Sequence, residues 1–191
     1  MKKNIIIPTL VLFLICLVST GLLAFANDLT EPIIEKLEEQ TEIESRKAVL
    51  ADAAEFKDEK AGDVAYAVGY GKDGAPVGLI FTTTEKSYGG DVKIMTGVDM
   101  EGKVKGVEIL SIEDTAGLGM NAQKESFRSQ FIGLVKGIVV QKNSSSRENN
   151  EITALTGATI TSKAVTAAVN QALDIYASVS AEYAQGGANN G

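Results

Sequence analysis

The first part of the chain is one long apolar segment. From Ile5 to Ala26 it contains no charged side chain. A helix of about 20 apolar residues spans the roughly 30 Å hydrocarbon core of a membrane. The pattern therefore predicts a single transmembrane helix over residues 5–26, retained as a membrane anchor.

The charges on either side of this segment predict its orientation. Lys2 and Lys3 precede it, and Asp28 and Glu31 follow it. Loops on the cytoplasmic side of a membrane carry the excess of Lys and Arg. We therefore expect residues 1–4 in the cytoplasm and the main domain outside it, at the outer face of a cell (inner) membrane.

A cleaved signal peptide is the alternative interpretation of this segment. Ala24, Phe25 and Ala26 form the small-x-small pattern that a signal peptidase prefers. The apolar stretch is longer than the region of about 7 to 15 residues that is usual in a signal peptide, which favours the membrane helix. The mass of the mature protein distinguishes the two.

An acidic helix is expected after the membrane segment. Thr30 can cap a helix with Pro32 in its first turn, and we expect this helix to continue to about Ala54. Its acidic residues are Glu35, Glu38, Glu39, Glu42 and Glu44. We interpret residues 27–55 as a helical stalk that leads away from the membrane, while a solvated helix face explains the carboxylates equally well.

The remaining chain, residues 56–184, is predicted to form one domain that opens with β-hairpins. A connecting loop is expected from Lys57 to Asp63. Alternation and turn residues predict one hairpin from Tyr66 to Phe81, turning at Asp73-Gly74, and another from Val92 to Leu110, turning at Glu101-Gly102. In each hairpin a glycine follows the turn glycine by four residues (Gly78 and Gly106), which indicates a repeated strand-turn-strand unit.

Helices and loops are expected in the rest of this domain. In chain order we expect a glycine-rich loop over 114–119, a short helix over Lys124 to Phe131, a strand over Val135 to Lys142, a polar loop over Asn143 to Asn150 and a helix over Ser162 to about Ala181. The last helix carries apolar residues at helical spacing, so it should pack on the sheet. Residues 185–191 are predicted to be a disordered tail. The fold class is α+β.

Composition narrows the chemistry that the chain can perform. It has no His, no Trp and a single Cys, Cys16, and so lacks the usual ligands of haem, iron–sulfur, zinc and copper centres as well as Ser-His and Cys-His nucleophile pairs. Any electron transfer then requires an organic cofactor. The net charge of −7 argues against a nucleic-acid partner, because binding phosphates needs clustered Lys and Arg.

One segment ahead of the final helix is suited to bind an anion. It reads Leu155-Thr156-Gly157-Ala158-Thr159-Ile160-Thr161-Ser162. Free N–H groups and the positive end of the helix dipole make a helix N-terminus an anion site. A phosphate bonded to the Thr159 hydroxyl would lie against these donors, with Lys163 as a countercharge. The alternative is that Thr159, Thr161 or Ser162 only caps the helix.

Nearly the whole chain resembles the G subunits of Rnf-type ion-translocating electron-transport complexes and, more distantly, the C subunit of the sodium-pumping quinone reductase. The resemblance is carried by the single N-terminal apolar helix, by Tyr88-Gly89-Gly90-Asp91-Val92-Lys93-Ile94-Met95 and by Thr156-Gly157-Ala158-Thr159. In that family the last Thr of [Ser/Thr]-Gly-Ala-Thr carries FMN through a phosphodiester bond. The resemblance therefore implies covalent FMN on Thr159, attached by a separate flavin transferase.

The resemblance also implies which residues surround the cofactor. Those near the attachment point are Thr156, Gly157, Ala158, Thr161, Ser162 and Lys163. The loop Asp114-Thr115-Ala116-Gly117-Leu118-Gly119 resembles the family's Glu-Thr-Pro-Gly-Leu-Gly, which lies by the isoalloxazine ring, so Thr115, Gly117 and Leu118 are candidate ring contacts. Asp114 replaces the family's glutamate, Ala116 its proline, and Thr153 stands where the family usually has Asp. An ordinary surface loop is the alternative for residues 114–119.

The function implied is that of a redox relay, with no catalytic residue or metal site of its own. The family's complex passes electrons between ferredoxin and NAD and couples this to the movement of sodium ions or protons, so the expected partners are its other membrane subunits. The alternative is a non-redox extracytoplasmic binding or scaffolding module anchored by one helix. Flavin fluorescence that persists in the denatured protein distinguishes the two.

Overall fold

The computed structural model describes residues 3–62, 64–143 and 146–186. Its helices and strands are α1 (Lys3–Val49), β1 (Glu55–Ala61), β2 (Val64–Tyr70), β3 (Pro76–Lys86), β4 (Asp91–Asp99), β5 (Val104–Ile112), α2 (Glu125–Arg128), β6 (Val139–Gln141), β7 (Glu151–Thr153) and α3 (Thr159–Gly186). Short 3-10 helices cover Gly119–Gln123, Ser129–Phe131 and Arg147–Asn149. The chain divides into two units, residues 1–42 and 43–191.

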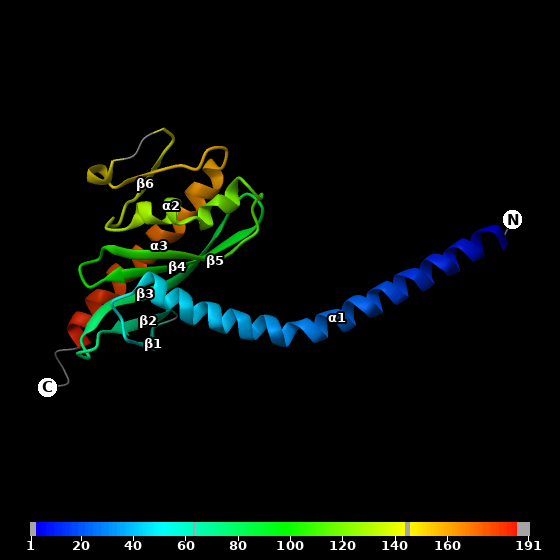
Figure 1. Ribbon diagram of the computed structural model, residues 1–191, viewed down its shortest axis with the longest axis horizontal. Coiled ribbons are helices and arrows are strands. Elements are labelled where there is room, and N and C mark those ends of the chain that lie inside the picture. The colour runs from blue at the N-terminus through cyan, green and yellow to red at the C-terminus, as the bar shows by residue number, and fades with distance from the viewer. Residues whose placement is uncertain (1–2, 63, 144–145, 187–191) are drawn as a thin grey trace. The chain divides into compact units, whose positions relative to one another are not determined.

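The first unit holds most of α1, which Figure 1 shows as one unbroken helix. Its stretch Ile6–Glu31 is long and apolar enough to cross a membrane, and the side chains in it are exposed. The prediction that Thr30 starts a second helix is wrong. The Thr30 hydroxyl instead donates to the carbonyl oxygens of Ala26 and Asn27, at 3.0 and 3.2 Å, as a threonine inside a helix does. Residues 1–2, half of the expected cytoplasmic terminus, lie outside the described residues.

The second unit is built on a five-stranded antiparallel sheet with the strand order β1-β2-β3-β4-β5. Both predicted hairpins are confirmed, as β2 with β3 and β4 with β5. Their turns contain Gly74 and Gly102 with φ of 78° and 83°, a backbone conformation that glycine adopts without steric cost. The fold class predicted from the sequence, α+β with antiparallel hairpins and helices, is confirmed.

Two expectations at the start of this unit are wrong. The helix ends at Val49 rather than near Ala54. The loop expected from Lys57 is instead a strand as far as Ala61, because β1 covers Glu55–Ala61 and pairs along its whole length with β2, while Asp63 lies outside the described residues. β1 is an edge strand with charged side chains on its surface, which is how natural sheets discourage further pairing. Because most of its residues are charged, β1 lacks the alternation of apolar and polar residues by which strands are recognised in a sequence.

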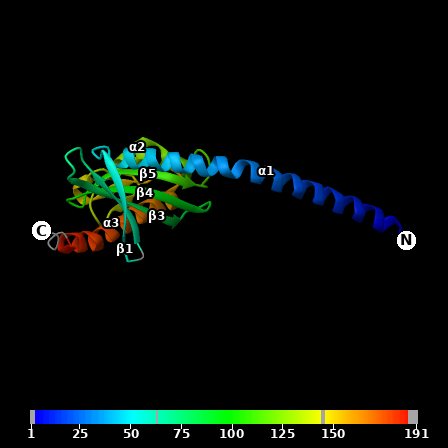
Figure 2. The ribbon, with the colours of Figure 1, turned by 90° about the horizontal axis from the view of Figure 1, so that it is seen from below.

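One face of the sheet is covered by α3, which runs beside β3 and β4 (Figure 1, Figure 2). The apolar positions of α3, including Val165, Val169 and Leu173, are buried in one cluster with Leu79 and Phe81 of β3. The predicted packing of this helix on the sheet is confirmed. The helix begins at Thr159 rather than Ser162 and extends to Gly186, which includes the first two residues of the predicted disordered tail. Residues 187–191 lie outside the described residues.

The opposite face of the sheet receives the last residue of α1 and the turn after it. Val49 and Leu50 are buried there with Ile80 and Met95. Glycines in the sheet make room for them. A Cβ on Gly78 would lie 2.5 Å from the carbonyl oxygen of Val98 and 2.8 Å from Leu50 Cδ1, and one on Gly106 would lie 2.7 Å from Val49 Cα. The two glycines that recur at the same spacing after the hairpin turns therefore serve the same purpose, close approach of this segment.

The segment between β5 and α3 forms the end of the domain that carries the site. The predicted short helix over Lys124 to Phe131 is confirmed as α2 and the 3-10 turn after it. The predicted strand over Val135 to Lys142 is reduced to β6, which pairs in parallel with β7. The sequence did not indicate β7, because three residues carry no periodic signal. In the predicted loop Asn143 to Asn150, residues 144–145 lie outside the described residues.

Candidate functional site

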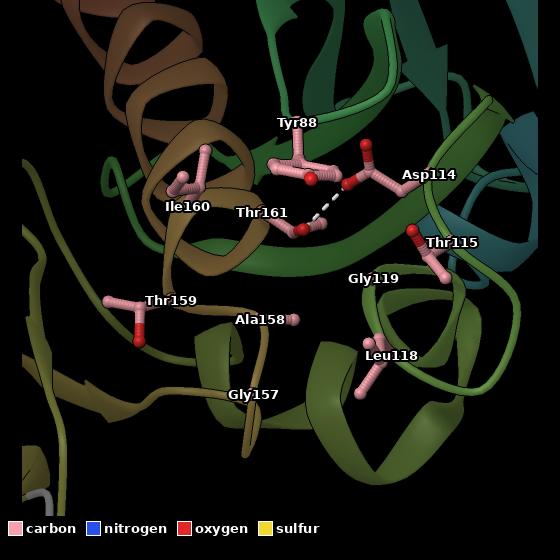
Figure 3. A pocket seen from close by; sticks show the side chains of 10 residues that line it. All are labelled: Tyr88, Asp114, Thr115, Leu118, Gly119, Gly157, Ala158, Thr159, Ile160 and Thr161. Atoms are coloured by element: carbon pink, nitrogen blue, oxygen red, sulfur yellow. Dashed lines mark hydrogen bonds between the residues drawn. The ribbon is translucent and has the colours of Figure 1, made fainter.

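A cavity of about 460 Å³ opens between the start of α3 and the glycine-rich loop after β5. Figure 3 shows the residues that line it: Tyr88, Asp114, Thr115, Leu118, Gly119, Gly157, Ala158, Thr159, Ile160 and Thr161. They come from the β3–β4 loop, the glycine-rich loop and the first turn of α3 with the residues just before it. Segments far apart in the sequence thus form one site.

The backbone ahead of α3 is turned so that the helix begins at the cavity. The N–H of Ala158 donates to the Leu155 carbonyl at 3.0 Å, and Gly157 inside this turn has φ of 75°, which favours glycine. The carbonyl of Ala158 then accepts from the N–H of Ser162 at 3.0 Å, closing the first turn of α3. The N–H groups of the preceding first-turn residues have no carbonyl one turn earlier in the helix to bond. The positive end of a 28-residue helix therefore faces the cavity.

The hydroxyl groups of this turn differ in whether they are already bonded. Thr161 is buried and donates to Asp114 Oδ2 at 2.5 Å. Ser162 is buried, donates to the Ala158 carbonyl and accepts from the Leu155 N–H, both at 2.9 Å. Thr159 is only half-buried, and its hydroxyl has no hydrogen-bond partner among the residues that the structure describes. Thr159 therefore does not cap the helix, and its oxygen is available.

Asp114 contributes a carboxylate to the cavity wall. It is 5% exposed and accepts hydrogen bonds from the Ser87 hydroxyl at 2.5 Å and the Gly89 N–H at 2.6 Å, in addition to Thr161. Burial, the largest single effect, acts to raise the pKa of Asp114, but the hydrogen bonds from Ser87, Thr161 and the backbone N–H groups of Gly89 and Tyr88 together outweigh it. The pKa of Asp114 lies below its ordinary value, so the group is ionised at neutral pH.

The structure brings together most of the residues singled out in the sequence. Thr115, Leu118, Gly157, Ala158, Thr159 and Thr161 line the cavity. Thr156, Ser162, Lys163 and Gly117 do not line it: Thr156, Lys163 and Gly117 are exposed, and Ser162 is bonded within the turn.

Sequence reasoning missed Tyr88, Asp114, Gly119 and Ile160 as lining residues. Tyr88 stands in a segment that carried the family resemblance, which was a usable signal. Asp114 had a weaker signal, as a replacement of the family's glutamate. Ile160 had none, because an exposed apolar side chain at a helix start has no distinguishing pattern.

Two family descriptions match the sequence. Residues 87–174 match the family described as the FMN-binding domain. Residues 1–49 match the family described as the RnfG N-terminal region. The residues that line the cavity, from Tyr88 to Thr161, all lie within the first of these ranges.

Similar proteins cover nearly the whole chain. The G subunit of the Na⁺-translocating ferredoxin:NAD⁺ oxidoreductase complex of Acetobacterium woodii is 35% identical over 90% of this chain and 91% of its own. The G subunit of the proton-translocating ferredoxin:NAD⁺ oxidoreductase complex of Clostridium ljungdahlii is 32% identical over 91% of this chain and 92% of its own.

Two solved structures of related proteins share the fold. The C subunit of the Na⁺-translocating NADH-quinone reductase from Parabacteroides distasonis is 25% identical, with a TM-score of 0.51 over 59% of this chain and 61% of that one. NqrC from Shewanella oneidensis has a TM-score of 0.50 at 16% identity, over 64% of this chain and 66% of its own. With the fold, the cavity and these matches in agreement, the chain belongs to the RnfG family, as a membrane electron-transfer subunit that carries an FMN-binding domain.

Proposed function

We propose that this chain holds FMN covalently, through a phosphodiester bond to the hydroxyl oxygen of Thr159. The observation that carries the proposal is the difference between the hydroxyls of the first turn of α3. Those of Thr161 and Ser162 are bonded and buried, whereas that of Thr159 has no partner among the described residues, and Thr159 lines the cavity.

The residues of the cavity fit a flavin mononucleotide. A volume of about 460 Å³ falls within the range of roughly 300–1,000 Å³ that is usual for cofactor sites. The small residues Gly157 and Ala158 let a phosphate approach the backbone at the helix start, and the helix dipole favours the negative charge that a phosphodiester keeps. The apolar side chains of Leu118 and Ile160 and the ring of Tyr88 offer surfaces for a planar aromatic ring.

Attachment requires an activated flavin, in which FMN is joined to a nucleoside monophosphate through a pyrophosphate bridge, and a separate flavin transferase. The Thr159 oxygen forms a new bond to phosphorus, the anhydride bond of the pyrophosphate breaks, and a nucleoside monophosphate leaves. The hydroxyl proton passes to the transferase or to water, and no electrons are exchanged. Lys163, exposed on the following turn of α3, supplies a nearby positive charge for the remaining phosphate charge.

Bound FMN supplies one- and two-electron chemistry. The chain's own residues hold it: Thr159 by the covalent bond, the N-terminal turn of α3 through its N–H groups, and Leu118 and Thr115 along the cavity wall. We place this domain outside the cytoplasm, because Lys2 and Lys3 precede the apolar helix and Asp28 follows it. A tether there prevents the loss of a cofactor that cytoplasmic pools do not replace.

The relatives' names suggest the complex in which this chain works. Both are subunits of ferredoxin:NAD⁺ oxidoreductases, one Na⁺-translocating and the other proton-translocating. We propose that this chain relays electrons between other membrane subunits of such a complex and binds neither ferredoxin nor nicotinamide itself.

The attachment is tested on the full chain, produced in membranes together with a flavin transferase. Flavin fluorescence of the denatured band and an intact mass increased by FMN less one water are the expected results. Thr159→Val should abolish both while the protein stays folded, and Thr84→Val, an exposed threonine on β3, should change neither. A Thr159→Val protein that keeps its flavin refutes the choice of residue. An unlabelled wild-type protein supports a scaffolding module instead.

A further inference from the structure

Asp114 lies where the segments that form the cavity meet. It follows β5 closely in the chain, and its carboxylate accepts hydrogen bonds from Ser87 and Gly89 of the β3–β4 loop and from Thr161 in the first turn of α3. The bond to Thr161 joins residues 47 positions apart in the chain. Figure 3 shows this bond among the residues that line the cavity, with Tyr88 drawn beside it.

The packing around Asp114 allows little adjustment. A Cβ on Gly119 would lie 2.5 Å from Asp114 Cβ and 2.7 Å from Thr161 Oγ1. A Cβ on Gly89 would lie 2.3 Å from the carbonyl oxygen of Glu113, the residue before Asp114. The β3–β4 loop and the glycine-rich loop are therefore in backbone contact at this carboxylate, and glycine is the residue that permits it.

Each segment joined by Asp114 also carries a cavity-lining side chain. Tyr88 stands between the two bonded residues of the β3–β4 loop, Leu118 lies in the glycine-rich loop, and Thr159 precedes Thr161 by two residues on the same helical turn. Hydrogen bonds to an ionised group are roughly twice as strong as neutral ones, so one carboxylate with these donors can hold the segments in place together.

We propose that Asp114 is the positioning residue of the flavin site: it joins the β3–β4 loop, the glycine-rich loop and the first turn of α3, so that the cavity is formed and Thr159 faces it before any flavin is attached. The inference rests on the proposed attachment to Thr159. It concerns the preformed geometry of the site, which can be measured without the flavin.

The first test distinguishes two effects of Asp114. One is the link, meaning the hydrogen bonds by which its side chain joins the three segments, and the other is the negative charge of the carboxylate. Asn at position 114 is isosteric, and its amide can accept from Gly89 while donating to the hydroxyl oxygens of Ser87 and Thr161, both of which also accept. Ala removes the link. We expect Asp114→Ala to lower flavin attachment in co-expressing cells by about tenfold or more, and Asp114→Asn to stay within about threefold of wild type. Asp174→Ala, which removes an exposed carboxylate elsewhere on α3, is the matched control and should behave as wild type.

The second test uses flavin-free protein, in which Thr159→Val is present in every sample. Amide hydrogen exchange at Gly89 should be at least about tenfold faster with Asp114→Ala than with Asp114→Asn, because the Gly89 N–H loses its acceptor.

A second variant keeps the proposal testable if Asp114→Ala does not fold. Thr161→Val removes only the hydroxyl on the α3 side of the link. With Thr159 intact, this variant should reduce both flavin attachment and the fluorescence anisotropy of the flavin that is attached.

The outcomes separate this inference from the attachment itself. Wild-type protein without flavin on Thr159 refutes the proposed function, and the exchange experiment still reports on the link. Wild-type attachment and anisotropy in both Asp114→Ala and Thr161→Val overturn the positioning role. A loss in Asp114→Asn as large as in Asp114→Ala also overturns it, because the negative charge, rather than the joined segments, would then be required.

Discussion

The carbonyl oxygen of Val49 lies directly against Gly97, at a position where a Cβ on that glycine would be 2.3 Å away. This contact joins the last residue of α1 to the C-terminal half of β4, and the atoms nearest the glycine are backbone rather than flexible side chain. Neither atom can rotate away, so the close approach depends on glycine.

Gly97→Ala should therefore destabilise the domain. The added methyl group must move either the end of α1 or β4, and overpacking of this kind costs about 1–3 kcal/mol. Urea unfolding followed by circular dichroism measures the change, with Lys93→Ala on an exposed position of the same strand as the control. Equal midpoints for Gly97→Ala and wild type would contradict the packing described.

Thr96→Val should stabilise the protein. The Thr96 hydroxyl is fully buried in β4 and, among the described residues, has no hydrogen-bond partner. A buried unsatisfied hydroxyl costs about 1–3 kcal/mol, and valine fills the same space without it. Differential scanning calorimetry should show a higher melting temperature. Thr83→Val is the informative contrast: its hydroxyl donates to the Ala168 carbonyl at 2.9 Å, so its loss should lower the melting temperature.

Asn170→Ala should loosen the segment between α2 and β6. The Asn170 side chain accepts from the N–H groups of Gly137 and Ile138, at 3.0 and 2.9 Å, and donates to the Ile138 carbonyl at 2.9 Å. Losing these bonds should cost about 2–3 kcal/mol, because the loop keeps backbone groups without partners. Faster hydrogen exchange at residue 138 measures the effect, with Asn149→Ala, an exposed position, as the control. Unchanged exchange would show that Asn170 does not hold the loop.

Asp114 should make stability depend on pH in the acid range. Because its pKa is lower in the folded chain than the ordinary value of 3.8, its contribution is fully present above that value and is lost as the pH falls through the folded pKa. The difference in unfolding free energy between wild type and Asp114→Asn should shrink as the pH is lowered from 7 towards roughly 2–3. A difference that is the same at both ends of this range would show that the carboxylate contributes nothing as an ion.

Local patterns in the sequence were sufficient to predict the apolar N-terminal helix, the two hairpins and the final helix of this protein. The apolar run up to Ala26, the glycine turns of the two hairpins and the helical spacing of Val165, Val169 and Leu173 each depend on residues close together in the chain, where backbone geometry and the burial of one face leave few alternatives. The family resemblance followed from equally local segments, and it pointed to the start of α3.

Tertiary structure decided what those patterns left open. β1 is a strand because β2 offers it an edge, although its own residues are charged. At the start of α3, the Thr161 hydroxyl donates a hydrogen bond to Asp114, a residue distant in the sequence. The Thr159 hydroxyl has no hydrogen-bond partner among the described residues. Such contacts are set by how the sheet places its loops beside the helix, and the free energy that selects them arises from packing across the whole domain rather than from any short segment.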